Sequence, residues 1–425
     1  MCISIRVRRR EICEKHIFDR LDELAAYLSR QPDNDASSAY EVGLRGMDIA
    51  GLAGTGYKSG NTTRDKLAKL FSAFCGKYVK VDLSELTGTV LGDSQISWYN
   101  FDAKRVNMDK LVSVILPKTL TRLGDDAFFG CTSLEEVCFP DTLQSIGEKV
   151  FYNCRSLKSV DLSHTKIVRL GEGNYAAAGS GSGAGAFYGC ASLAAVKLPA
   201  ASIEMVGEDV FSQCPSLKKV SNFPDSGNLT KIVRNAFRDT ALNTVELPES
   251  VKDIGAYSFY GTKAEKIVFP KNLYRIRLHA FQSCANLNEI TLPASLCDDA
   301  KLAKEEFIFG IGQYAFADCT NLETVHSLKV NPPTISKHIF DNCSTELQII
   351  VPNETAKMLY EMDCEWARWN IKDKNEVYLA LKQKDTENIA IVLQKKMEDG
   401  TYQTTQGIIN KNTPTKTGEK IILYE

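Results

Sequence analysis

A short phrase recurs along this chain at intervals of roughly two dozen residues. It consists of an aliphatic residue, a gap of four residues, a phenylalanine, and a cysteine or threonine three residues later, as at residues 123–131 and 146–154. Self-similarity at such a period predicts a solenoid, in which each unit buries its apolar face only against its neighbours. The nine phenylalanines that anchor the phrase are Phe128, Phe151, Phe187, Phe211, Phe237, Phe259, Phe281, Phe316 and Phe340.

A second phrase precedes each phenylalanine phrase. It reads leucine, two residues, valine or isoleucine, one residue, leucine or phenylalanine, and usually proline, as at residues 111–117, 134–140, 193–199, 242–248 and 287–293. The alternating apolar residues predict a half-buried strand, and the proline predicts its end because proline cannot donate a hydrogen bond to a neighbouring strand. Stacked turn upon turn, these strands predict a parallel sheet on one face, with short helical or turn segments on the other.

The order of strand, proline, Ile-Gly and Ala-Phe-x-x-Cys elements resembles the BspA-type (Treponema-like) class of leucine-rich repeats. The resemblance covers about residues 111–352 and predicts about nine repeats there. Three copies depart from the pattern: Ser163 replaces the proline, Arg277 replaces the glycine, and Ala264 replaces the leading leucine. The resemblance implies a leucine-rich-repeat solenoid, a protein-binding role, and a location on a bacterial surface or outside the cell.

Residues 1–110 do not repeat and predict a small α/β region that caps the apolar end of the stack. Apolar residues at helical spacing predict an amphipathic helix over residues 11–30, and Thr62-Thr63 has the character of a helix start before Leu67 and Leu70. Apolar and polar residues alternate over residues 40–46 and 78–84, which predicts strands there. The second of these segments is similar to the strand of a leucine-rich repeat.

At the other end, residues 347–352 predict the last strand of the solenoid and residues 353–370 a capping helix. Residues 371–425 alternate in places and predict a small β-module, with Asp399-Gly400 as a hairpin turn. Two spacings between phenylalanines are about a dozen residues longer than the others, because of insertions near 171–185 and 297–309. We expect these insertions to leave the stack as loops, the first of them a glycine-rich mobile tip.

The thirteen cysteines predict a column of buried thiols rather than a set of disulfides. Seven of them fall three residues after a core phenylalanine, and threonine takes the same place at Thr240 and Thr262. Stacked turns would hold these side chains parallel, a geometry that suits a disulfide badly. The seven are Cys131, Cys154, Cys190, Cys214, Cys284, Cys319 and Cys343.

Charge and hydropathy exclude several classes of partner. The 51 basic and 53 acidic residues give a net charge of −2, so nothing in the bulk charge favours nucleic acid or an anionic membrane. No apolar run reaches the roughly 18 residues that a membrane helix needs, and the basic N-terminus lacks the apolar core of a secretory signal. Taken as it stands, this N-terminus predicts a cytoplasmic protein, against the surface location that the resemblance implies. We expect a monomer that does not insert into a membrane.

Signals for catalysis, cofactors or metals are weak. The five histidines have no metal-ligand spacing, and no nucleophile elbow or phosphate-binding loop is present. Residues 171–176 match a relaxed dinucleotide fingerprint without the strand-and-helix context that it needs. Asp33, Asp35 and Asp298-Asp299 predict solvated turn residues, and His279 a partly exposed one. The sequence therefore predicts no catalytic, cofactor or metal site, and a protein that is not an enzyme.

The remaining candidate site is the outward side of the predicted strands. Its repetitive face of mixed charge suits broad contact with a protein better than enclosure of a small molecule. The resemblance implies an adhesin-like protein that binds host extracellular matrix or another cell-surface protein, and the rival interpretation is an intracellular scaffold. The candidate contact residues are Asp161, Lys197, Lys219, Glu246, Lys266, Glu289 and Thr291.

Overall fold

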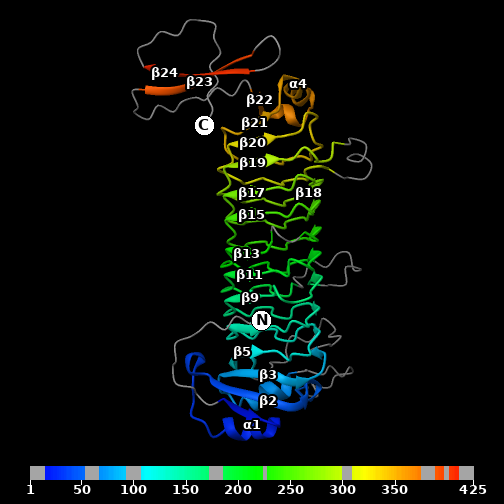
Figure 1. The fold of residues 1–425 in the computed structure, drawn as a ribbon, viewed down its shortest axis with the longest axis vertical. Coiled ribbons are helices and arrows are strands. Elements are labelled where there is room, and N and C mark those ends of the chain that lie inside the picture. The colour runs from blue at the N-terminus through cyan, green and yellow to red at the C-terminus, as the bar shows by residue number, and fades with distance from the viewer. Residues whose placement is uncertain are drawn as a thin grey trace.

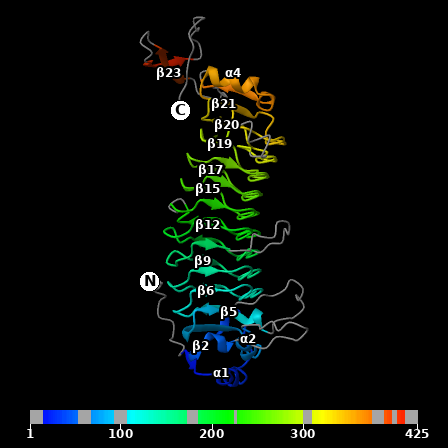
Figure 2. The ribbon, with the colours of Figure 1, turned by 90° about the vertical axis from the view of Figure 1, so that its right-hand side faces the viewer.

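Stacked turns of short parallel strands make up most of the molecule (Figure 1). The computed structural model describes residues 15–52, 67–91, 107–171, 185–223, 227–298, 309–374, 388–396 and 402–410. The turns follow one another along a single axis, with α1 (Leu21–Leu28) at one end of the stack and α4 (Glu354–Met362) at the other, as Figure 2 also shows. The repeats predicted from the sequence therefore form a solenoid.

Each turn contributes one longer strand to a side that we call the strand face. The central valine or isoleucine of these strands is buried and the residue before it is exposed, as at Val160, Val245 and Ile267. This alternation fixes which side chains point outward. The strands are β5 (Leu111–Ile115), β7 (Glu136–Cys138), β9 (Ser159–Asp161), β11 (Ala195–Lys197), β13 (Lys219–Ser221), β15 (Thr244–Glu246), β17 (Lys266–Val268), β19 (Glu289–Leu292), β20 (Thr324–Ser327), β21 (Gln348–Val351) and β22 (Asn370–Asp373).

A second ladder of two-residue strands runs along another side of the stack. At Gly255 a side-chain carbon would lie 2.6 Å from the carbonyl oxygen of Ile232 in the previous turn, which explains the recurring Ile-Gly pair. Bridges from Ile276 to Ile311 and from Ile311 to Ile335 extend the ladder. Its strands are β4 (Val90–Leu91), β6 (Arg122–Leu123), β8 (Ser145–Ile146), β10 (Arg169–Leu170), β12 (Met205–Val206), β14 (Lys231–Ile232), β16 (Asp253–Ile254) and β18 (Arg275–Ile276).

The strand face is parallel throughout, as predicted, but it is not one unbroken sheet. Hydrogen-bonded pairing divides it into β1-β2-β3-β5-β7, β9-β11-β13, β15-β17 and β19-β20-β21-β22, where β1 is His16–Phe18, β2 is Tyr40–Asp48 and β3 is Val79–Thr87. The second ladder, by contrast, is continuous from β4 to β18. It therefore connects the turns where pairing on the strand face is interrupted.

The core is a column of stacked phenylalanine rings on the tight-turn side of the repeats. Successive ring centroids from Phe128 to Phe340 lie 5.1 to 5.8 Å apart, with planes 2° to 22° from parallel. All nine rings are at most 1% exposed. Backbone hydrogen bonds hold the column in register, since the N–H of Phe128 donates to Val150 and that of Phe211 to Ala236 at 2.9 Å each.

The aligned cysteines are free thiols beside this column, as predicted. Six are fully buried and Cys343 is half-buried. Each Sγ from Cys154 onward contacts the carbonyl oxygen of the phenylalanine in the preceding turn, for example Cys154 with Phe128 at 3.2 Å. Burial raises the pKa of the Cys154 thiol well above its ordinary value. The aligned cysteines are therefore part of the packed core.

The N-terminal region contains both helix and strand, but the helix predicted over residues 11–30 is wrong at residues 16–18. Within the described part of that range α1 is helical, whereas His16–Phe18 form β1, which pairs in parallel with β2. Main-chain pairing at the edge of the sheet outweighs the helical spacing of the apolar residues there. The predicted helix after residue 67 is α2 (Ala68–Ala73), whereas Thr62-Thr63 lies outside the described residues. Both predicted strands are present, as β2 and β3.

The C-terminal end of the solenoid is closed by α4. Asn353 caps this helix, its Oδ1 accepting a hydrogen bond from the N–H of Ala356 at 2.9 Å. Trp366 is fully buried, with its ring centroid 6.4 Å from that of Phe340, and ends the aromatic column. The following strand, β22, pairs in parallel with β21, so the prediction that residues 347–352 form the last strand is wrong: the sheet extends to residue 373, into the segment predicted as the β-module.

Beyond the solenoid, β23 (Asn388–Lys396) and β24 (Tyr402–Asn410) pair as an antiparallel hairpin. This hairpin was predicted from the alternation around residue 390. The turn at Asp399-Gly400, the alternating segment at residues 377–381, and most of both insertions lie outside the described residues. The short 3₁₀ helices of the chain are Ala36–Ser38, Ile49–Leu52, Met108–Lys110 and Trp366–Arg368.

Candidate functional site

The seven candidate residues all lie on the strand face. They belong to β9 (Asp161), β11 (Lys197), β13 (Lys219), β15 (Glu246), β17 (Lys266) and β19 (Glu289 and Thr291). Six are exposed and Asp161 is half-buried. Because they come from different groups of paired strands, they form a discontinuous row along the solenoid rather than one compact cluster.

Two candidate residues contact each other directly. Asp161 and Lys197 are partners in the β9–β11 register, and Lys197 Nζ lies 2.8 Å from Asp161 Oδ2. Partial burial raises the pKa of Asp161, but hydrogen bonds from Lys197 and Ser163 outweigh it and hold the pKa below its ordinary value. Further along, His326 Nε2 lies 3.0 Å from Glu289 Oε1. Polar side chains of neighbouring turns are thus in contact, directly opposite in register for Asp161 and Lys197 and diagonally for Glu289 and His326.

Three other candidates carry charges without a counter-ion in the described part of the chain. Lys219, Glu246 and Lys266 are exposed, and none of them forms an ion pair there. They lie on consecutive turns, in β13, β15 and β17. A charge that is not already neutralised is available to a partner, so this central part of the strand face is its most accessible electrostatic feature.

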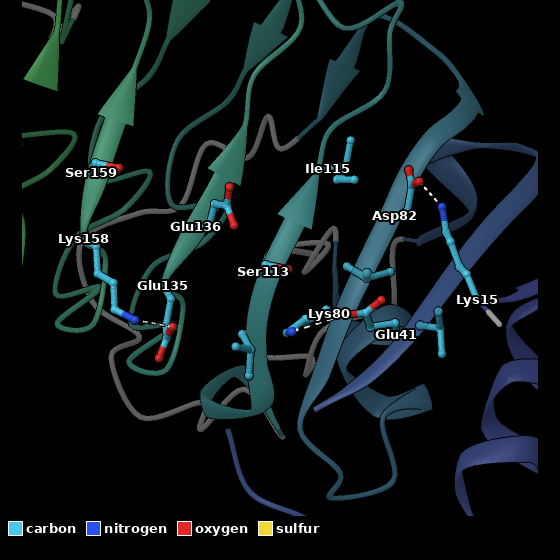
Figure 3. Close-up of a pocket in the computed structure, with 13 residues that line it drawn as sticks. Lys15, Glu41, Lys80, Asp82, Ser113, Ile115, Glu135, Glu136, Lys158 and Ser159 are labelled. Atoms are coloured by element: carbon cyan, nitrogen blue, oxygen red, sulfur yellow. Dashed lines mark hydrogen bonds and ion pairs between the residues drawn. The ribbon is translucent and has the colours of Figure 1, made fainter. Parts of the chain in front are cut away.

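An open cavity of about 480 Å³ lies on the strand face near its N-terminal end (Figure 3). Its walls come from β2, β3, β5, β7, β9 and the segment before β1. Charged side chains dominate the lining: Lys15, Glu41, Lys80, Asp82, Glu135, Glu136 and Lys158, with Ser113 and Ser159 between them. The cavity is therefore polar, unlike the apolar pockets that enclose most small-molecule ligands.

Most charges in this cavity are paired. Lys15 pairs with Asp82, and Figure 3 shows the two side chains directed at each other from neighbouring segments. Burial raises the pKa of Asp82, but hydrogen bonds from Lys15 and Ser84 outweigh it and hold the pKa below its ordinary value. Exposed Glu136 has no ion-pair partner among the described residues.

This cavity was not predicted from the sequence, since residues 1–110 were predicted to be a cap and the seven candidate residues begin at Asp161. The signal was present in the strand at residues 78–84, where Lys80 and Asp82 alternate with the buried Val79, Val81 and Leu83. That alternation shows that β3 contributes outward charges to the same face as the repeats.

The sequence of the repeat region matches the model of the BspA type leucine rich repeat region. The match consists of six copies and covers residues 99–179, 182–298 and 301–362, which is more than half of the chain. The chain belongs to the BspA-type leucine-rich repeat family. Its fold is a leucine-rich-repeat solenoid.

Solved structures similar to this chain include leucine-rich repeat proteins from bacteria. A leucine-rich repeat protein from Bacteroides ovatus is 23% identical with a TM-score of 0.47, and the match covers 68% of this chain and 65% of that protein. A leucine-rich cell surface protein from Faecalibacterium prausnitzii is 23% identical with a TM-score of 0.36, over 68% and 84% of the two chains. The chain thus spans about two thirds of the first of these relatives. Comparison with curated proteins gives no match.

Within this BspA-type solenoid, the inward and outward positions of the strands differ in variability from turn to turn. The inward position keeps valine or isoleucine at Val137, Val160, Val196, Val245 and Ile267, all nearly or fully buried. The outward position that directly follows this central valine or isoleucine changes at each turn. It is occupied by Ile115, Cys138, Asp161, Lys197, Ser221, Glu246, Val268, Thr291 and His326. The repeat therefore constrains the residues of the core, whereas the outward residues of the strand face vary and can form a specific surface.

Other residues singled out in the sequence form ion pairs, cap a helix or lie partly exposed at a turn. Asp33 pairs with Lys77, and Asp35 caps the 3₁₀ helix at Ala36–Ser38, so both serve as turn residues, as predicted. Asp298 pairs with Lys329 at 3.1 Å. His279 is half-exposed, as predicted.

Neither a metal site nor a membrane-spanning helix is found among the described residues. Among these residues, no group of three or more His, Cys, Asp or Glu side chains is placed to hold a metal ion. None of the helices in the same part of the chain has the length and apolar character that a bilayer crossing requires. Residues 172–176 of the dinucleotide-like segment lie outside the described residues.

Proposed function

We propose that this chain is a non-catalytic module that binds a partner protein on its strand face. The observation that carries the proposal is the row of exposed charges at Lys219, Glu246 and Lys266, which lie on consecutive turns and form no ion pair with any described residue. Such a row suits an extended protein surface, because it runs along an open face and does not enclose a small molecule. Electrostatic complementarity would then set partner choice and association rate.

The proposed contact surface includes all seven candidate residues and the N-terminal cavity. Lys197 and Asp161 would contribute as a pair, whereas Glu136 at the cavity offers a single free acidic group. The lining of the cavity includes serines but no histidine or cysteine. The carboxylates Glu41, Asp82 and Glu135 are held in ion pairs with lysines, which suits a polar contact surface.

We further propose that the protein acts as an adhesin-like protein at a bacterial cell surface, with an extracellular-matrix protein or another cell-surface protein as partner. Membership of the BspA-type family supports this location. The second candidate, an intracellular scaffold, is favoured by the free cysteines at Cys75 and Cys364. Both are exposed, and exposed free thiols are more typical of a reducing compartment.

Charge reversal tests the binding face. The variant Lys219→Glu with Lys266→Glu changes two unpaired side chains of the strand face, and Lys231→Glu with Lys252→Glu makes the same change at exposed positions of the second ladder and the segment before it. Full-length wild-type protein and both variants are used to capture partners. The captured protein is then titrated against the wild type and each of the two variants. We expect loss of binding only for the strand-face variant; equal effects of both variants contradict the proposal.

Surface labelling tests the location. Intact cells are treated with a protease or a membrane-impermeant biotin reagent, with a cytoplasmic protein as control. Labelling or cleavage of this chain under conditions that leave the cytoplasmic control unmodified supports the cell-surface location. Labelling only after lysis supports the intracellular scaffold.

A further inference from the structure

A second column of residues on the tight-turn side has an unusual backbone conformation. The residue two positions before the core phenylalanine has a positive φ of 52° to 64° at Asp126, Lys149, Asp209, Asn235, Tyr257, His279, Tyr314 and His338. Asparagine and aspartate adopt this left-handed conformation at low cost, whereas it is unfavourable for bulky side chains. Four successive turns of the C-terminal half nevertheless place an aromatic residue there.

These four side chains form one continuous stack, which we call the aromatic ladder (Tyr257, His279, Tyr314 and His338). Successive ring centroids lie 4.3, 5.0 and 5.1 Å apart, with planes 12° to 16° from parallel. The ladder lies at the surface, since three of its residues are half-exposed and His338 is exposed. Backbone bonds position it: the N–H of Tyr257 donates to Leu278, and that of His279 donates to Gln313.

Two arginines lie at the N-terminal end of the ladder. The guanidinium carbons of Arg234 and Arg238 are each 5.7 Å from the centroid of Tyr257, and that of Arg238 is 4.7 Å from the centroid of Tyr260. Arg238 also contacts Asp239 at 3.2 Å. Arg234 is exposed and forms no ion pair with any described residue. Arg234 therefore has no direct ion-pair partner among these residues, although its charge acts on the carboxyl of Asp209 and lowers its pKa.

The acidic groups along the ladder are already bonded within the protein. Asp318 accepts hydrogen bonds from Gln282 and Asn342, at 2.7 and 2.8 Å, and these hold its pKa below the ordinary value. Asp341 lies 2.7 Å from Nδ1 of His338. By contrast, Lys337 is exposed beside His338, and Leu278 beside His279 is 42% exposed. Asp318 keeps its negative charge beside its neutral amide donors, so the cations that face the rings are those at the N-terminal end of the ladder, Arg234 and Arg238.

The geometry limits what such a surface can bind. The faces of the inner rings are covered by neighbouring rings, so neither a nucleobase nor a sugar can stack on them. Ring edges, tyrosine hydroxyls and arginines remain accessible, and tyrosine and arginine are enriched at the energetically dominant positions of protein interfaces. We infer that the aromatic ladder with Arg234 and Arg238 is a second interaction surface, which binds an acidic segment of a partner protein. This surface is separate from the strand face, so the inference does not rest on the proposed function.

A peptide titration of the full-length protein tests the inference. The probe is a short fluorescein-labelled peptide in which glutamate alternates with leucine, and the matched control peptide has lysine in place of glutamate. Binding is followed by fluorescence anisotropy. We expect the acidic peptide to bind at least about tenfold more tightly than the basic one. Equal binding of the two peptides, or no binding of the acidic one, overturns the inference.

Substitutions locate the binding site of the acidic peptide. The test variant is Arg234→Glu with Tyr257→Asn; asparagine already occupies the same column as Asn235, so the backbone conformation is kept. The control Lys149→Asn removes a positive charge at the same column outside the ladder. We expect the test variant to weaken peptide binding about tenfold or more, and the control and Lys219→Glu with Lys266→Glu to have little effect. Equal losses in all three variants would identify non-specific attraction and contradict the inference.

Discussion

The rings of Phe151 and Phe187 stack with centroids 5.1 Å apart and planes 9° from parallel, although 36 residues separate them in sequence. Phe128 and Phe151, which are 23 residues apart, stack at 5.4 Å. The first insertion therefore leaves the spacing of the core unchanged. A solenoid allows this because each turn contacts only its neighbours, so extra residues in one turn need not displace a ring in the next.

Removal of one ring from the column should strongly destabilise the protein. Phe211 is fully buried and lies 5.5 Å from both Phe187 and Phe237. Phe211→Ala leaves a cavity between two rings, so we expect the free energy of unfolding to fall by about 3–5 kcal/mol. Urea unfolding of wild type and variant measures the change. The control Tyr274→Ala, at a side chain that is 42% exposed, should have a much smaller effect; a loss below about 1 kcal/mol at Phe211 would contradict the stacked core.

Accessibility to a thiol reagent should divide the cysteines into two groups. Cys75 and Cys364 are exposed and should react in the native protein, whereas Cys154 and the other buried thiols should react only after denaturation. Burial also raises the pKa of Cys343 to about 12, which keeps its thiol protonated. Mass spectrometry of the labelled protein identifies the modified residues. A crosslink between Cys131 and Cys154 in native protein would contradict the structure.

One buried carboxyl should make stability depend on pH. Asp209 is 5% exposed, and burial, reinforced by Glu208, raises its pKa to about 6. Because the folded-state pKa lies above the ordinary value of 3.8, the contribution of this group to stability is full below about pH 4 and is lost as the pH rises through about 6. At pH 8 the charged form should destabilise the fold by on the order of 2–3 kcal/mol.

The variant Asp209→Asn tests this dependence. Asparagine tolerates the left-handed backbone, and the variant should be more stable than wild type at pH 8, with the difference disappearing near pH 4. Urea unfolding across this range measures it, with Asp126→Asn as a control in the same column, where the side chain is half-exposed. A difference that grows as the pH falls would contradict the burial of an ionisable carboxyl.

The sequence predicted the solenoid because its core positions repeat in register. Phe211 and Cys154 lie where the phrases place them, since a side chain at a fixed repeat position meets its counterpart in the next turn. The segment at His16–Phe18 was harder to predict: its apolar residues have helical spacing, and only the edge of a sheet formed by distant residues makes it a strand. Local patterns cannot report such long-range pairing.

The candidate site was predicted only in part, for a related reason. Alternation identified which side chains point outward, and this is correct for Lys219 and Glu246. Which of them are paired depends on register between turns, as for Lys197 with Asp161. The aromatic ladder was not predicted, because Tyr257 and His279 occupy a column that elsewhere contains aspartate, lysine and asparagine. No recurring residue type identifies this column in the sequence.

Deletion of the first insertion should leave the solenoid intact. Removal of residues 172–184 returns the separation of Phe151 and Phe187 to 23 residues, the value found for Phe128 and Phe151. The stacked rings already have the ordinary spacing, and the free energy of closing a loop changes slowly with its length. We therefore expect the free energy of unfolding to change by less than about 1 kcal/mol, as measured by urea unfolding.

The same deletion separates the strand face from the insertion as the site of partner binding. If the partner binds the strand face, the deletion variant should retain the affinity of wild type, and reversal of Lys219 and Lys266 to glutamate should weaken binding equally in both backgrounds. The loss of affinity caused by this charge reversal should also be smaller at high salt, because exposed charges act mainly through long-range attraction that salt screens. A stable deletion variant that no longer binds would instead assign recognition to residues 172–184, since the strand face is unchanged in it.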